Sequence, residues 1–213
     1  MHGRSVVVRK AGWIASAAAA VLVAAGGITC AVAQDGGSGD TPAADSADAG
    51  FARDMAVHHQ QAVEMSFIVR DRTQNEDVRL LAYDIAQTQA NQRGMLLGWL
   101  DLWELPKVSS DPPMTWMGMG GMASGEDGAL MPGMATNTEM AKLRKLSGKQ
   151  AEVFYLQLMT DHHKGGIHMA EACVERCSVT VEKQIAQGMV NGQESEIQLM
   201  ADMLEERGAK ARP

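Results

Sequence analysis

The sequence predicts an all-α protein in which two copies of one helical hairpin form a four-helix bundle. Apolar residues recur at three- and four-residue spacing through four long segments, the pattern of helices that bury one face. Short polar turns join the two members of each pair, so paired helices should pack antiparallel. The second pair repeats the first at a constant offset of 104 residues, as Met159 repeats Met55. Each hairpin alone would leave an apolar face in water, which predicts that the two associate with an approximate two-fold relation.

We expect the bundle to occupy residues 51–207. Its predicted parts are a first hairpin at 51–105, an irregular stretch at 106–139 and a second hairpin at 140–207. The four long helices are predicted at 51–72, 77–105, 150–176 and 178–207. Pro106 closes the second of these helices, because proline cannot continue a helix. A short helix capped by Thr138 is expected to precede the third.

Residues 1–33 have the features of a secretory signal peptide. An apolar run follows three basic residues and ends at Ala31-Val32-Ala33, a small-residue cleavage site before Gln34. The basic residues are Arg4, Arg9 and Lys10. We therefore expect an exported protein, located outside the cell or in the cell envelope, that meets the membrane only through this signal. The alternative is lipid attachment at Cys30, which would leave a lipoprotein.

The predicted mature chain is acidic. Removing the three positive charges of the signal changes the formal net charge from −7 to −10. Such a charge argues against nucleic-acid binding, which depends on neutralising phosphates, and would concentrate cations near the surface. Residues 34–50 are mostly Gly, Ser, Asp, Ala and Pro, so they are predicted to form a flexible tether.

The irregular stretch at 106–139 is rich in methionine among Gly, Pro and Ser. Its methionines are Met114, Met117, Met119, Met122, Met131 and Met134. Such a loop should lie on the surface, where exposed thioethers would collect metal ions. The alternative is a linker whose methionines pack onto the bundle, since methionine commonly fills gaps in cores. The sequence favours neither.

Two windows repeat the pattern M-x2-HH-x5-M. The residues are Met55, His58, His59 and Met65 in the first window and Met159, His162, His163 and Met169 in the second, which also contains His168. Because a helix turns about 100° per residue, the first histidine and both methionines of each window share one face. Imidazole and thioether together suit a copper ion. Cu(I) is favoured, with His and Met ligands, whereas Cu(II) would use the imidazoles with oxygen donors.

The adjacent histidines point about 100° apart, so they cannot face the bundle axis equally. We expect one to bind the ion while the other binds a second ion or caps a carboxylate such as Asp161. Because ligation requires neutral imidazole, we expect binding to weaken below about pH 6.5. The competing interpretation is that these histidines are hydrogen-bonded core residues and the methionines are packing.

Cys173 and Cys177 remain after export, four residues apart near the end of the third long helix. An oxidising compartment favours a disulfide, provided that the helix frays there, because an ideal helix holds such a pair near the upper limit of Cα separation. Otherwise the two thiolates are further ligands for Cu(I).

Three functional classes fit these patterns. The first is a binding protein that sequesters copper or delivers it, with another copper protein as a possible partner and no turnover of its own. The second is a helical interaction or structural module without metal. The third is a di-metal oxidase, which would require Glu-x-x-His pairs; the sequence contains none. We therefore expect no enzymatic activity.

The repeated Met-His-His-Met windows, together with Met131-Pro132-Gly133-Met134 and the closing Gln193-x2-Glu196-Ile197-x2-Met200, resemble the CopM-like family, also catalogued as domain-of-unknown-function family 305. The resemblance implies a ferritin-like four-helix fold in an exported bacterial protein, with copper binding and a contribution to copper tolerance. It also implies metal binding by the eight Met and His residues of the windows. Two features depart from the pattern. Gly165-Gly166 interrupts the third helix, and Arg93 stands where the second copy has the apolar Ile197.

Overall fold

The computed structural model describes residues 41–120 and 126–213, and every regular element there is helical. The predicted signal peptide, Cys30 and the first part of the tether lie outside the described residues. The long helices are α1 Ala47–Arg70, α2 Glu76–Leu102, α4 Gly148–Arg176 and α5 Thr180–Glu206. The short ones are α3 Asn137–Lys145 and the 3-10 turns η1 Thr115–Met117 and η2 Glu126–Gly128. In the described part, no helix combines the length and apolar character needed to cross a membrane.

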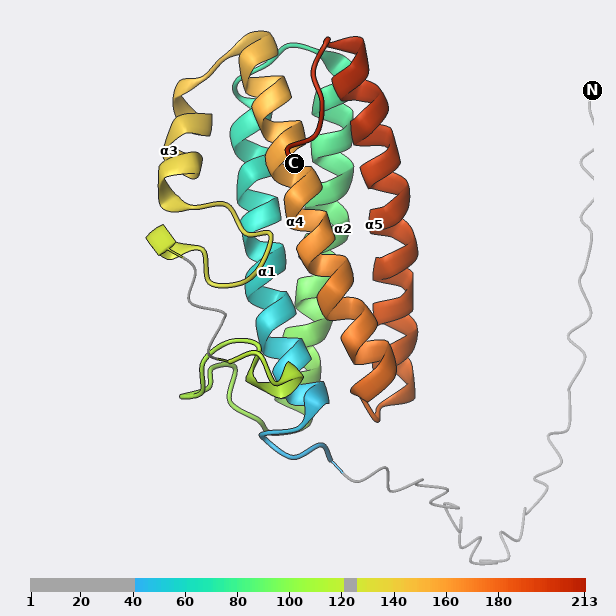
Figure 1. Ribbon diagram of the computed structural model, residues 1–213. Coiled ribbons are helices and arrows are strands. Elements are labelled where there is room, and N and C mark those ends of the chain that lie inside the picture. Colours follow the sequence, from blue (N-terminus) through green and yellow to red (C-terminus); the bar gives the residue numbers. More distant parts are fainter. Residues whose placement is uncertain (1–40, 121–125) are drawn as a thin grey trace, which may run out of the picture. The chain divides into compact units, whose positions relative to one another are not determined.

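The all-α prediction is confirmed (Figure 1). α1 packs against α2 and α4 packs against α5, and the two hairpins meet along α1 and α4. α1 and α4 run in opposite directions, so the second Met-His-His-Met window passes the first in reverse. This arrangement is the two-fold relation that the internal repeat predicts.

Capping side chains begin two helices at residues other than those expected. α1 begins at Ala47, inside the predicted tether, because Ser46 accepts a hydrogen bond from the Ala49 amide at 3.2 Å. The cap of α3 is Thr136 rather than Thr138, since Thr136 forms a reciprocal capping box with Glu139. α2 ends at Leu102, three residues earlier than expected.

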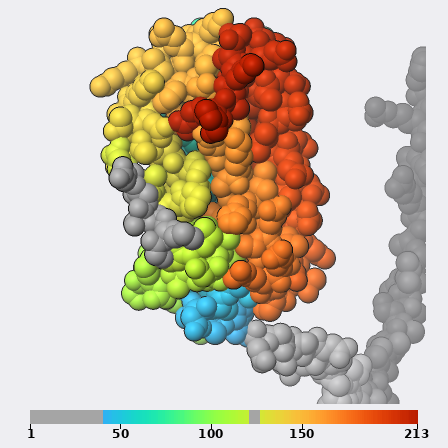
Figure 2. All heavy atoms as spheres, viewed as in Figure 1, coloured from blue at the N-terminus to red at the C-terminus, as the bar shows by residue number. Residues whose placement is uncertain are grey.

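The methionine-rich stretch packs onto the bundle. Met114, Met117 and Met131 are buried in the core, and Met119 and Met134 are partly buried against it. This result supports packing for these five residues and is contrary to an exposed metal-collecting loop; Met122 lies outside the described residues. In Figure 2 the yellow-green segments cover one flank of the bundle beside α4.

Side chains of α1 hold this stretch in place. Asp54 accepts hydrogen bonds from the Met114 amide at 2.7 Å and from Trp116 Nε1 at 2.9 Å. Gln61 donates to the Ala135 carbonyl at 2.8 Å and accepts from the Ala135 amide at 2.7 Å. The loop is therefore fixed at both ends of its path across α1, which explains how its methionines reach the core.

Gly165 and Gly166 do not interrupt α4, which runs continuously through them. The loop crosses α4 so closely that a Cβ on Gly165 would lie 2.1 Å from the Pro132 carbonyl oxygen. A Cβ on Gly166 would lie 2.5 Å from Oε1 of Gln193. The two glycines therefore allow close packing on both sides of the helix.

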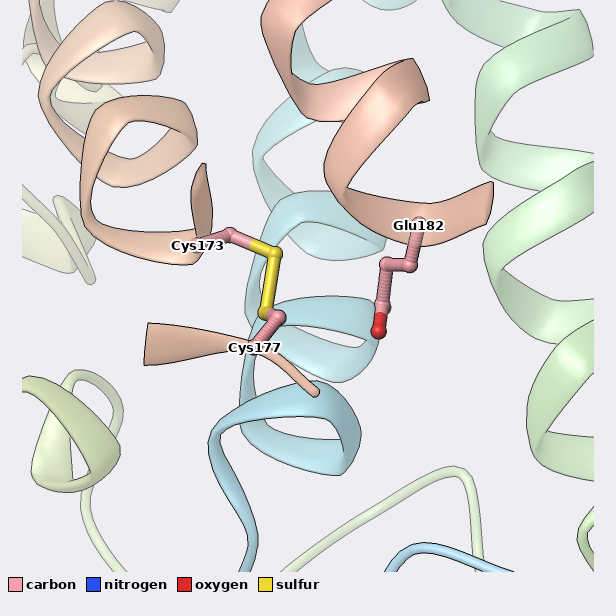
Figure 3. A group of neighbouring side chains, drawn as sticks. All are labelled: Cys173, Cys177 and Glu182. Atoms are coloured by element: carbon pink, nitrogen blue, oxygen red, sulfur yellow. A yellow bond between two sulfur atoms is a disulfide. The ribbon is translucent and has the colours of Figure 1, made fainter. Parts of the chain in front are cut away.

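Cys173 and Cys177 form a disulfide, as the oxidising compartment favours (Figure 3). Helical geometry ends at Arg176, and Cys177 takes an extended conformation, with its Cα 4.8 Å from that of Cys173. The disulfide thus lies where the chain turns from α4 into α5. Thiolate ligation of copper by these residues is excluded while they are oxidised.

We predict that Gly165→Ala destabilises the protein by about 1–3 kcal/mol, because the added methyl group would overlap the Pro132 backbone. Gly188→Ala is the matched control, since Gly188 also lies inside a helix but a Cβ there would meet nothing within 4 Å. The control should gain up to about 1 kcal/mol from helix propensity. Urea unfolding measures both values; equal stabilities for the two variants would contradict the proposed loop packing.

Candidate metal centre

Eight of the nine predicted ligands are buried in the bundle. The fully buried residues are Met55, His58, His59, Met65, Met159, His162, His163 and Met169, each with an exposed fraction of 0%. His168, by contrast, is exposed, and the structure does not bring it into this group. It follows His162 by six residues, which places it about 120° away around the helix.

His58 and His162 face each other where α1 and α4 pack. Their ring centroids are 3.7 Å apart, with an angle of 32° between the planes. His162 Nε2 lies 3.0 Å from the His58 carbonyl oxygen and must donate, because a carbonyl only accepts. The neutral ring therefore keeps an unshared electron pair on Nδ1, which has no partner among the described residues. Neither ring nitrogen of His58 has hydrogen-bond geometry with a described residue, although the Pro132 backbone lies close enough to raise the pKa of the ring slightly.

His59 and His163 point away from this pair, toward the outer helices. His59 Nε2 lies 2.9 Å from Gln92 Oε1 on α2, and His163 Nε2 lies 2.6 Å from Glu196 Oε2 on α5. The carboxylate partner is thus Glu196, whereas Asp161 accepts a hydrogen bond from Arg212 at 2.7 Å. These contacts put a proton on each Nε2, so the buried Nδ1 atoms of both rings are again unpartnered acceptors.

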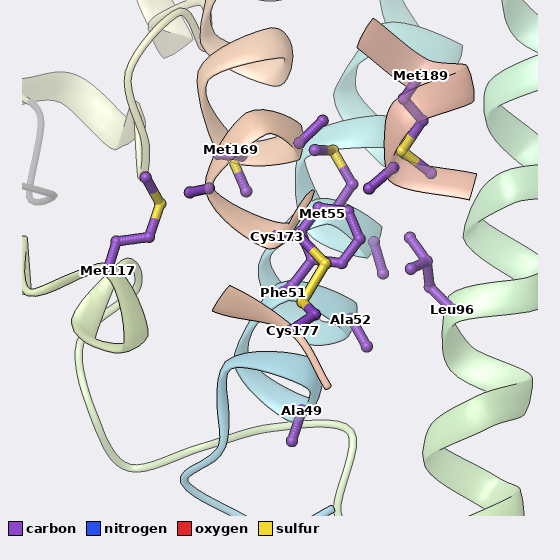
Figure 4. Close-up of a cluster of buried hydrophobic side chains, with 14 of the residues drawn as sticks. Ala49, Phe51, Ala52, Met55, Leu96, Met117, Met169, Cys173, Cys177 and Met189 are labelled. Carbon is purple, nitrogen blue, oxygen red and sulfur yellow. A yellow bond between two sulfur atoms is a disulfide. The ribbon is translucent and has the colours of Figure 1, made fainter. Parts of the chain in front are cut away.

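The predicted methionines fall into two apolar clusters on either side of the histidines. Met55 and Met169 belong to one cluster, which includes the disulfide (Figure 4). Met65 and Met159 belong to the other. Along both helices the histidines lie between one methionine of each cluster, so the bundle holds a polar layer with a thioether pair on each side.

The four imidazoles do not by themselves form a three-nitrogen site. No three of them bring a ring nitrogen within 4.8 Å of one another. A soft ion in this layer would therefore combine one or two imidazoles with thioether sulfur, the donor set that suits Cu(I). The residues present fit that ion, because unpartnered nitrogens and buried sulfurs occur in the same short length of bundle.

Gln89 and Gln193 extend the polar layer onto α2 and α5, and sequence reasoning did not predict them as site residues. Both are buried, and the Gln89 amide and Gln193 Oε1 have no partner in the described part of the chain. With Gln92 and Glu196 they line a cavity of about 70 Å³ between the two helices. The internal repeat was the available signal, since it aligns Gln89 with Gln193.

Burial keeps three of the four histidines neutral. Burial, with smaller contributions from the neighbouring imidazoles, lowers the pKa of His58 and of His59 from 6.5 to about 3. Burial also lowers the pKa of His162 well below its ordinary value, with smaller contributions from His58 and the adjacent imidazoles. The expectation that ligation weakens below about pH 6.5 therefore needs correction, because the folded protein keeps these rings unprotonated at lower pH.

We predict that the metal-free protein becomes less stable as the pH falls below 6.5. Between that value and about 3 the unfolded chain binds protons at His58 and His59 while the folded protein does not. Each such histidine contributes up to about 1.4 kcal/mol per pH unit. Urea unfolding between pH 7 and about pH 4 should give a shallower pH dependence for His59→Gln. His168→Gln, at an exposed position, is the control, and an unchanged slope in His59→Gln would contradict the assignment.

Comparison with known proteins agrees with this architecture. A Streptomyces coelicolor protein of family DUF305, for which secretion is inferred, is 74% identical with a TM-score of 0.75, covering 80% of this chain and 99% of that one. A DUF305 fragment from Deinococcus radiodurans is 28% identical with a TM-score of 0.62, covering 75% and 96%. No curated protein matches the chain.

CopM also shares the fold. Its Cu(I)-bound form is 16% identical with a TM-score of 0.57, covering 75% of this chain and 96% of that one. Its Cu(II)-bound form is 20% identical with a TM-score of 0.56, covering 73% and 94%. The model of the family described as domain of unknown function (DUF305) matches residues 48–204, which include both histidine windows. The chain therefore belongs to the DUF305 family.

Proposed function

We propose that this protein binds copper outside the cell or in the cell envelope, and sequesters the ion or passes it to another copper protein. The observation that carries the proposal is the buried histidine layer. Four Nδ1 atoms there lack hydrogen-bond partners among the described residues, and a methionine pair lies on either side. A buried acceptor without a partner costs about 1–3 kcal/mol, so these nitrogens require a role that a purely structural layer does not supply.

The His58–His162 pair is the centre of the proposed site. Nδ1 of both rings would be donors, with thioether sulfur from Met55 and Met169 or from Met65 and Met159. This soft set favours Cu(I). Cu(II) would be held better near His163, where Glu196 adds a carboxylate oxygen to the imidazole.

Two comparisons support the proposal. CopM, a protein of the same fold, has been solved with Cu(I) and with Cu(II). Secretion is inferred for the Streptomyces coelicolor relative, in accord with the signal peptide predicted at residues 1–33. By holding copper ions away from other molecules, a protein of this kind would contribute to copper tolerance. We propose binding without turnover, because the histidine layer has no Glu-x-x-His pair of the kind that di-metal oxidases use.

We predict that replacing His58 and His162 with alanine weakens Cu(I) binding at least tenfold, equivalent to about 1.4 kcal/mol. Anaerobic titration against a chromophoric Cu(I) chelator measures the affinity, and circular dichroism verifies that the helices remain. His168→Ala is the matched control, since it removes an exposed imidazole from the same helix. Unchanged affinity in the folded double variant, or an equal loss in the control, would contradict the site assignment.

The methionines give a separate prediction. Replacing Met55 and Met159 with leucine keeps the buried volume nearly constant, so the fold should survive. We expect Cu(I) affinity to fall several-fold while Cu(II) affinity changes little, because Cu(II) depends less on thioether. Parallel titrations with the two oxidation states measure the difference. An equal loss for both ions would show that the methionines act through packing.

A further inference from the structure

The Cys173–Cys177 disulfide lies beside a buried carboxyl group that belongs to the next helix (Figure 3). Glu182 lies in the first turn of α5, and its side chain runs alongside the disulfide. One ligand atom from each of the three residues lies within 4.8 Å of the other two. All three residues are buried, and they come from the junction of α4 with α5 rather than from the histidine layer.

The Glu182 carboxyl group lies beside another acidic group. Its exposed fraction is 0%, it forms no ion pair with a described residue, and the carboxyl group of Asp48 is within its hydrogen-bonding reach. Burial, the nearby charge of Asp48 and this hydrogen bond together raise the pKa of Glu182 to about 9, so the group carries a proton at neutral pH. Two neighbouring buried carboxyl groups attract a cation, because a positive charge offsets their repulsion.

Asp48, the other nearby carboxylate, already has partners. It accepts hydrogen bonds from the amides of Ser178 and Val179, both at 2.8 Å, and from the Ser178 hydroxyl at 3.1 Å. These contacts fix the turn that follows Cys177. Asp48 thus holds the junction in place, and Glu182 is the carboxyl group that lies within ligand distance of the sulfurs.

We propose that reduction of the Cys173–Cys177 disulfide creates a second metal site, in which both thiolates and the Glu182 carboxylate bind a borderline divalent cation of the Zn²⁺ class. A dithiol reductant supplies two electrons and two protons, the S–S bond breaks, and the reductant becomes a disulfide. The incoming cation then displaces the two thiol protons and the Glu182 proton. Cysteine sulfur and carboxylate oxygen are both ordinary Zn²⁺ ligands, and a solvent molecule would complete four-coordination.

The proposed zinc site differs from the proposed copper centre in its dependence on the disulfide and in its ligand atoms. The disulfide blocks this site under oxidising conditions. The histidine layer contains no thiol, so the proposed copper centre does not require reduction of the disulfide. The carboxylate also favours a harder ion than a thioether does. Each site can therefore be tested while the other is removed.

The test is a Zn²⁺ titration of oxidised and reduced protein against a chromophoric chelator. Every sample carries Cys30→Ser, which leaves Cys173 and Cys177 as the only cysteines of the chain. The reduced sample is treated with dithiothreitol and desalted under argon. We expect one more Zn²⁺ per chain in the reduced protein than in the oxidised protein. The additional ion should persist when His58 and His162 are replaced by alanine, which separates this test from that of the copper centre.

Glu182→Gln tests the carboxylate. The amide has the shape of the protonated acid, so the variant should fold, and we expect its reduced form to bind the additional Zn²⁺ at least tenfold more weakly. Glu175→Gln, at an exposed position between the two cysteines, is the control and should have no effect. In parallel, Cd²⁺ should give a thiolate charge-transfer band in the reduced protein and none in the oxidised protein. Equal Zn²⁺ stoichiometry in both redox states, or full affinity in Glu182→Gln, would overturn the proposal.

Discussion

The contact between His58 and His162, whose ring centroids are 3.7 Å apart at the packing interface of α1 and α4, places uncharged imidazoles in the middle of an apolar core. Water is excluded there, so the rings stay neutral and their unpartnered nitrogens remain available for a ligand. The apolar clusters on either side must offset the cost of this layer, which is about 1–3 kcal/mol for each unsatisfied atom. Stability therefore comes from the clusters, while the histidine layer contains the candidate metal donors.

The duplication of the hairpin determines the geometry of this layer. Because equivalent residues of the two copies meet across an approximate two-fold axis, His58 faces its counterpart His162, and each flanking cluster receives one methionine from either copy. The symmetry is broken at two points. His59 meets the neutral Gln92, whereas His163 meets the charged Glu196. The loop is held on α1 by hydrogen bonds to Asp54 and Gln61, but its backbone lies directly against α4 at Gly165. The two halves consequently offer different environments to ions of different charge.

Sequence reasoning predicted the fold class and grouped the candidate ligands that lie in the core, because both depend on regular spacing. The helical period and the repeat fixed which faces pack, and eight of nine predicted ligands are in the core. Positions that depend on irregular backbone were harder to predict. The burial of Met114 follows from hydrogen bonds to Asp54, a contact between residues far apart in the sequence. In the sequence Gly165 suggested an interruption of the helix, whereas in the structure it allows the loop to pack closely against α4. His168 lies within the second window, but its angular position directs it to solvent.

For the same reason, the junction of α4 and α5 around the disulfide was only partly predicted. The spacing of Cys173 and Cys177 indicated a disulfide if the helix ended nearby, and α4 does end there. Glu182 carried no signal, because a single glutamate in the first turn of a helix is ordinary and its burial depends on how α5 meets α1. Burial and the closeness of Asp48, both properties of the folded chain, distinguish it from the exposed glutamates.

The central claim is that copper binds within the histidine layer. Anomalous diffraction from crystals of the Cu(I)-loaded protein, recorded on both sides of the copper absorption edge, tests this claim most directly. The account predicts an anomalous peak inside the bundle, within bonding distance of a ring nitrogen of His58 or His162 and of at least one of the four buried methionines. Peaks confined to the surface, for example at His168, with none in the histidine layer, would contradict it.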